Sequence, residues 1–163
     1  MRENRLHGTA LNWRARLDST REATIQPETP RFDTLSKRGA RRVIQRALVL
    51  VGRNRAVRQN LRAVELNSLW MIEDLDLDWT VLIERGRPEF HRGRVGHPQV
   101  ILRWRMGEDF FHHIESGAPR EGSYVFEGEA SWRRVIDTVF NAFAKALRTV
   151  LVDPVGDDGE RLL

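Results

Sequence analysis

An apolar stripe near the carboxy-terminal end constrains this chain more than any other feature. Its members recur at three- and four-residue spacing: Val135, Ile136, Val139, Phe140, Phe143, Ala144, Leu147, Val150 and Leu151. This spacing predicts an amphipathic helix of about five turns. Asp153-Pro154 is expected to end it, because proline cannot continue a helix. The sequence therefore contains one long helix with a single apolar face.

The region before this helix has the two-residue period and composition of strands. Strands are expected at 68–72, 79–83, 88–93, 99–106 and 123–132, and Arg85-Gly86-Arg87 is a hairpin signal between the second and third. In 99–106 the apolar residues alternate with Arg103 and Arg105, which indicates a half-buried strand. Residues 107–117 predict a short helix that opens with Glu108 and Asp109, where the helix dipole favours acidic side chains, and stops at a glycine.

The first 64 residues differ in both pattern and charge. Residues 1–34 show no sustained period and are expected to form an irregular basic arm. Residues 35–64 have a helical pattern with Ser36 as a cap, and Gly52 and Asn54 are expected to divide it into two helices. The domain boundaries are therefore placed at 1–34, at 35–64 for a helical basic segment, at 65–152 for an α+β domain, and at 153–163 for a flexible tail.

The charge is strongly asymmetric along the chain. Residues 1–62 hold 15 Lys or Arg and 5 acidic residues, whereas residues 63–163 hold 12 and 18, which together give the net charge of +4. The basic segment could dock to an acidic protein partner or to an anionic membrane surface, or it could wrap over its own acidic domain. The candidate docking residues are Arg38, Arg41, Arg42, Arg46, Arg53, Arg55 and Arg58.

Length and composition limit the remaining classes of protein. The 163 residues fit one domain with an appendage, and the chain contains no cysteine, which excludes disulfides and thiolate metal sites. The longest apolar run, 47–51, is far shorter than the ~20 residues of a membrane-spanning helix. The amino-terminal segment lacks the apolar core of a secretory signal, so we expect a cytoplasmic location.

Three segments follow one another in a characteristic order: residues 78–86 (Asp-Trp-Thr-Val-Leu-Ile-Glu-Arg-Gly), 98–102 followed by the helix 107–117, and 124–130 (Tyr-Val-Phe-Glu-Gly-Glu-Ala). In this order they resemble the sterol-carrier-protein-2-like family. The resemblance covers about half of the chain. It implies an α+β fold with a five-stranded, mostly antiparallel sheet covered on one face by helices, here preceded by the basic helical segment.

The resemblance also implies that an apolar ligand, such as a sterol, a fatty acyl chain or a quinone-like lipid, is bound in a tunnel between the sheet and the helices. The candidate lining residues are Trp79, Val81, Leu102, Trp104, Phe110, Phe111, Ile114, Tyr124, Phe126, Phe140 and Phe143. The same residues could instead pack against one another as an ordinary core, and a sequence pattern does not distinguish the two.

Other functions find less support. No nucleophile elbow, phosphate-binding glycine loop or dinucleotide fingerprint is present, so we expect no catalysis and no cofactor. His112 and His113 are expected on the exposed face of their helix and not as metal ligands, since a site usually needs three converging ligands. The basic segment has few aromatic residues for base stacking, and nucleic acid is not an expected partner. The leading hypothesis is non-catalytic binding or presentation of an apolar ligand; the alternative is a scaffold or regulatory subunit of a larger complex, with no lipid bound.

Overall fold

The computed structural model describes residues 34–163, and the predicted irregular arm, 1–34, lies outside the described residues except for Thr34. Two helices come first: α1 (Lys37–Arg53) and α2 (Arg55–Asn60). The predicted cap is confirmed, because the Gly39 amide donates to the Ser36 hydroxyl at 3.0 Å. The division is confirmed as well: the Asn54 side chain accepts from the amides of Ala56 and Val57 and so starts α2.

Five strands follow in the predicted order: β1 (Leu66–Ile72), β2 (Leu77–Glu84), β3 (Arg87–Arg92), β4 (Val100–Trp104) and β5 (Tyr124–Glu127). They form one sheet with the order β3-β2-β1-β4-β5. The β1–β4 pair is parallel and the other three pairs are antiparallel. This confirms the α+β class and the mostly antiparallel five-stranded sheet.

The β2–β3 connection is a two-residue loop, Arg85-Gly86, in which both residues have positive φ, at 50° and 76°. Two positive φ angles are typical of the type I′ turn, whose twist matches that of a hairpin. The glycine is needed for a second reason, since a Cβ at Gly86 would lie 2.8 Å from the Cα of Arg62. The hairpin therefore packs closely against the residues that follow α2.

The strand predicted at 123–132 is shorter in the structure. β5 ends at Glu127, and Ala130–Trp132 forms a single 3₁₀ turn that leads into α4 (Arg133–Val152). The limit is set by the neighbouring strand: Glu127 pairs with Ile101, next to the first residue of β4. A pattern of alternating apolar residues does not reveal where its pairing partner begins.

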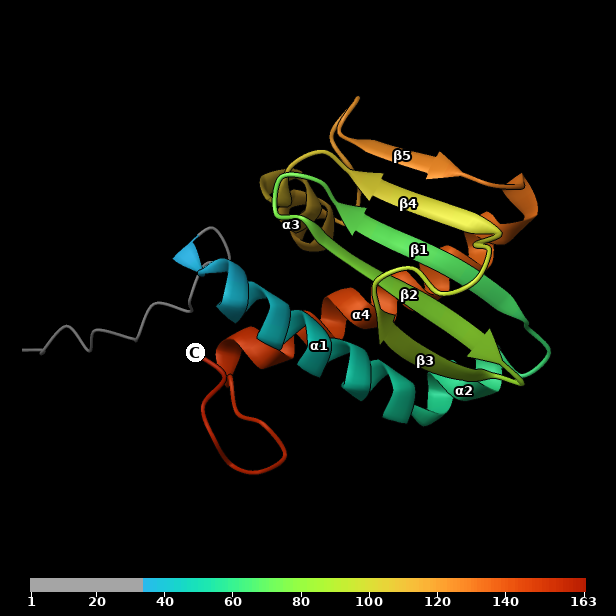
Figure 1. Cartoon of the computed structure of the whole chain (residues 1–163). Helices are drawn as coiled ribbons and strands as arrows, with labels where there is room; N and C mark the ends of the chain where they lie inside the picture. The colour runs from blue at the N-terminus through green and yellow to red at the C-terminus, as the bar shows by residue number, and fades with distance from the viewer. Residues whose placement is uncertain (1–33) are drawn as a thin grey trace, which may run out of the picture.

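One face of the sheet is covered by α4, with α1 beside α4 on the same side and α2 near the β3 end, as Figure 1 shows. α3 (Gly107–Ser116) lies at one end of β4 and ends at Gly117 in the left-handed conformation. Part of the opposite face is covered by the β3–β4 connection. There the Thr80 hydroxyl donates to the Gly93 carbonyl and accepts from the Val95 amide. Thr80 and its register partner Leu69 are both buried on this side of the sheet, away from the helices.

The basic segment 35–64 is part of the same core. Val43, Ala47 and Val51 of α1 are at most 2% exposed and belong to one apolar cluster with the sheet and α4. The tail, expected to be loose, follows a defined course: Val155 forms a β-bridge with Arg161, and the Leu162 amide donates to the Pro154 carbonyl at 2.8 Å.

Candidate functional site: the groove between the first helix and the sheet

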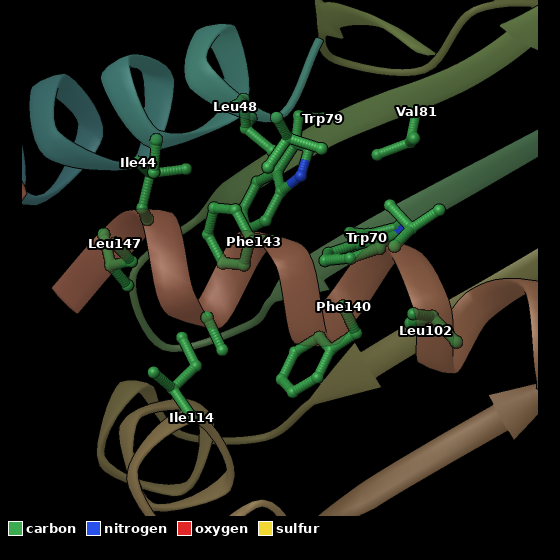
Figure 2. Close-up of a cluster of buried hydrophobic side chains, with 14 of the residues drawn as sticks. Ile44, Leu48, Trp70, Trp79, Val81, Leu102, Ile114, Phe140, Phe143 and Leu147 are labelled. Carbon is green, nitrogen blue, oxygen red and sulfur yellow. The ribbon is translucent and has the colours of Figure 1, made fainter. Parts of the chain in front are cut away.

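Most of the predicted tunnel residues lie in the space between the sheet and α4. Eight are buried: Trp79, Val81, Leu102, Trp104, Phe110, Ile114, Phe140 and Phe143. Phe111, Tyr124 and Phe126 are partly buried and pack against the same cluster. Figure 2 shows Trp70 and Trp79 of the sheet meeting Phe140 and Phe143 of α4.

The aromatic rings of this set contact one another directly. The ring centroids of Trp104 and Phe110 are 4.9 Å apart, and those of Trp70 and Phe143 are 5.8 Å apart, both in edge-to-face geometry. These residues therefore belong to one apolar cluster of sheet and helices. That they open into a tunnel stays a prediction, and the observed contacts are those of a packed core.

A groove with a volume of about 430 Å³ lies at the edge of this core, between α1 and strands β2 and β3. That volume is within the range of small-molecule sites, roughly 300–1,000 Å³. Of the predicted ligand-binding residues, Trp79 lines it; the remaining apolar wall consists of Ile44, Leu48, Leu77 and Phe90. In Figure 2, Leu48 extends from α1 to Trp79 of the sheet, and Ile44 lies between α1 and Leu147 of α4.

Trp79 has a feature that the other core tryptophans lack. The Trp70 indole N–H donates to the Ser68 hydroxyl, and that of Trp104 donates to Nδ1 of His113, each at 3.1 Å. The Trp79 indole N–H is buried and has no hydrogen-bond partner among residues 34–163. An unpaired buried donor costs roughly 1–3 kcal/mol. Because the nitrogen has almost no accessible surface, this is a cost of the packed core and not a group that faces the groove.

Two arginines stand at the edge of the groove. Arg92 lies directly opposite Trp79 in the β2–β3 register, so both side chains are on the groove side of the sheet. Arg41 reaches the groove from α1. Neither arginine has an ion-pair partner within the described part of the chain, whereas Asp76 at the groove end is paired with Lys37 at 3.5 Å. The groove thus has an apolar wall, and its edge carries two unpaired arginines together with the carboxylates of Asp76 and Asp78.

The remaining predicted docking arginines do not form one surface. Arg46 and Arg53 bind Asp157 of the tail, and Arg42 reaches the Leu162 carbonyl at 3.5 Å. Arg38 is exposed on α1. Arg55 and Arg58 are exposed on α2 and line a shallow depression beside the Arg85-Gly86 turn. Arg41 alone of the seven lines the groove.

His113 is a correction to the sequence analysis, because it is buried at 9% exposure instead of lying on the exposed face. Its ring is 4.2 Å from that of Phe140, centroid to centroid. Burial lowers the pKa of His113 to about 4, so the imidazole is neutral and Nδ1 is free to accept the Trp104 proton. Burial likewise raises the pKa of Tyr124 to about 12. Within residues 34–163 no group of three or more His, Asp or Glu side chains could hold a metal ion.

Comparison with known proteins gives a likeness of fold. No protein-family model matches the chain, and no curated protein matches it. A solved structure described as a conserved hypothetical protein and possible sterol carrier protein, from Thermus thermophilus, is 10% identical, with 66% of this chain and 85% of that one covered and a TM-score of 0.48. The UbiJ-SCP2 ubiquinone synthesis protein is 9% identical, with 64% and 87% covered and a TM-score of 0.43.

A stereoselective inverting sec-alkylsulfatase from Pseudomonas sp. is also matched, at 13% identity and a TM-score of 0.39 over 48% of this chain. The chain spans about one seventh of the length of that enzyme and of its double mutant. Two of the matched structures carry the sterol-carrier description that the sequence motifs resemble, and the likeness concerns the fold. At these identities and TM-scores it carries no inference about ligand or activity, which must come from the groove.

Proposed function

We propose that the domain binds an amphiphile, an apolar molecule with an anionic end such as a fatty acid, in the groove between α1 and strands β2 and β3. The observation that carries the proposal is the apolar wall of this groove, with two arginines, Arg41 and Arg92, at its edge. Arg41 and Arg92, both without an ion-pair partner in residues 34–163, would neutralise a carboxylate or phosphate at the edge.

The size of the groove fits this class of ligand. Micromolar affinity corresponds to about −8 kcal/mol. Each buried methylene supplies about 0.8 kcal/mol, so about ten of them are needed before the cost of ordering the ligand is counted. On this arithmetic, the ligands to test first are those with an apolar chain of at least about ten methylenes.

We further propose that the domain carries and presents its ligand without chemistry. None of the side chains that line the groove is a serine, threonine, cysteine or lysine that could serve as a nucleophile beside a base. The histidine of the groove, His91, lies beside Glu89 at 3.5 Å on the rim strand β3.

The experiment uses cis-parinaric acid, a fluorescent fatty acid, below its micellar concentration. Gln45 is exposed and lines the groove, so Gln45→Trp should fill it without disturbing the core, and affinity should fall at least about tenfold. Gln59→Trp makes the same substitution at an exposed position of α2 outside the groove and should bind as the parent does. Equal affinity in both variants would contradict the assignment of the groove.

The anionic end is tested separately with oleic acid and its methyl ester. Replacing Arg41 and Arg92 together with Gln should weaken binding of the acid and leave binding of the ester unchanged. If acid and ester lose affinity equally, the arginines contribute packing and not charge. Native mass spectrometry of the protein purified from its own source would then identify the natural ligand by its mass.

The alternative function, a scaffold or regulatory subunit with no lipid bound, is supported by the direct ring contacts between sheet and α4. If the purified protein carries no lipid, binds no fatty acid and arrives with other subunits, the scaffold function is the correct one.

A further inference from the structure

The tail occupies the side of α1 that faces away from the groove. Asp157 accepts hydrogen bonds from two arginines of α1: one carboxylate oxygen is 2.6 Å from Nη1 of Arg46, and the Arg53 guanidinium binds both oxygens, at 3.1 and 3.0 Å. Two parallel N–H···O bonds from one guanidinium are the geometry by which arginine recognises a carboxylate. These bonds hold the pKa of Asp157 below its usual range.

The contact between the tail and α1 involves more than this ion pair. α1 contains six basic residues and no acidic one, whereas the tail 153–163 contains four acidic residues and one arginine. The tail also presents apolar side chains: Leu162 packs against the core, and Leu163 approaches so closely that a Cβ at Gly39 would be 3.2 Å from it. The contact therefore combines a carboxylate held by two arginines with neighbouring leucines on the same helix face.

The ion pairs are exposed and therefore easily exchanged. The Asp157 side chain is 53% exposed and that of Arg53 is 62% exposed. Exposed ion pairs contribute little because each ion keeps much of its hydration in the separated state. A partner that offers a carboxylate and apolar side chains in the same arrangement could take the place of Asp157 and of the leucines of the tail.

We propose that the Arg46–Arg53 face of α1 is a docking surface for an acidic peptide segment of a partner protein, and that the tail occupies it as an intramolecular competitor. The tail shows the chemistry of the occupant: a carboxylate at the arginine pair, a tight turn and a leucine that follows. A flat anionic membrane offers the charge but not the leucine at a fixed distance from it. The surface lies on another side of α1 from Arg41, Ile44, Gln45 and Leu48, so it is independent of the groove.

The test is a competition followed by NMR in the whole chain. A synthetic peptide with the sequence of residues 153–163 is titrated to millimolar concentration while the Nε–Hε signals of Arg46 and Arg53 are observed. In the parent the tethered tail, at an effective concentration of the order of millimolar, should suppress peptide binding. In Asp157→Asn the tail's carboxylate is removed, and the same titration should shift both signals saturably, with at least about a tenfold gain in affinity.

Glu160→Gln is the matched control, because it removes the same charge from the tail at a residue that contacts neither arginine in the structure. It should behave as the parent does, and Asp157→Asn combined with Arg46→Gln and Arg53→Gln should lose the gain. Equal binding to the parent and to Asp157→Asn would overturn the competitor role. Binding of Asp157→Asn to phosphatidylserine vesicles but not to the peptide would overturn the peptide assignment in favour of a membrane.

Discussion

At the scale of single residues, three buried tryptophans differ mainly in their hydrogen bonds. Replacing any of them with phenylalanine removes similar volume, but Trp70→Phe and Trp104→Phe also leave a partner unsatisfied. Trp79→Phe removes a donor that has no partner within residues 34–163. We therefore expect Trp79→Phe to be less destabilising than either of the others by about 1–3 kcal/mol. Urea unfolding of the three variants measures this, and equal losses would show that the Trp79 N–H is bonded in solution.

The buried imidazole of His113 predicts a dependence of stability on pH. Its folded pKa of about 4 is below the ordinary 6.5, so between these values the unfolded state binds more protons than the folded state. Stability should therefore be complete above about pH 6.5 and should fall as the pH decreases toward 4. His113→Phe should lose this decrease, and thermal melts of parent and variant between pH 4 and 7 compare the two slopes. If the melting temperatures of the parent and of His113→Phe depend on pH with the same slope, His113 is not the group responsible for the loss of stability at low pH.

At the scale of elements, the backbone strain of the β2–β3 hairpin turn can be measured separately from the steric contact between this turn and α2. Gly86 and Gly93 have nearly the same φ, 76° and 77°, so alanine strains the backbone equally at both. A Cβ at Gly93 would meet nothing within 4 Å, whereas one at Gly86 would press on the backbone of Arg58 and Arg62. Gly93→Ala should cost about 1–2 kcal/mol, and Gly86→Ala about 1–3 kcal/mol more. Similar melting temperatures for Gly86→Ala and Gly93→Ala would show that the backbone of Arg58 and Arg62 can move to accommodate the added methyl group at little cost in stability.

The elements themselves could be read from the sequence because their periods are local. The α4 stripe, the Ser36 cap and the Arg85-Gly86 turn each depend on a few neighbouring residues, and each was predicted. The end of β5 and the burial of His113 depend on residues distant in sequence, Ile101 and Phe140, and were not. The groove was missed for the same reason, since it joins α1 to β2 and β3, and an unpaired tryptophan N–H leaves no signal in a sequence.

At the scale of the whole molecule, the question is whether residues 35–64 are a separate appendage or part of the folding unit, and the burial of the apolar face of α1 bears on it. The sequence placed a domain boundary after residue 64, yet Val43, Ile44, Leu48 and Val51 are at most 4% exposed within the common core. Burying an aliphatic side chain contributes about 1.5–3 kcal/mol, so these four contribute roughly 6–12 kcal/mol. That is comparable to the whole stability of a domain, about 5–15 kcal/mol.

A fragment of residues 65–163 should therefore fail to fold on its own, because it would expose the surface of α4 and β3 that α1 covers in the intact protein. We expect no cooperative urea transition for the fragment by tryptophan fluorescence. For the whole chain, fluorescence and circular dichroism at the helix band should give coincident transitions, as expected of one cooperative unit. A fragment that unfolds cooperatively near the midpoint of the whole chain would instead make residues 35–64 an appendage, and the groove would then be a surface between two separable parts.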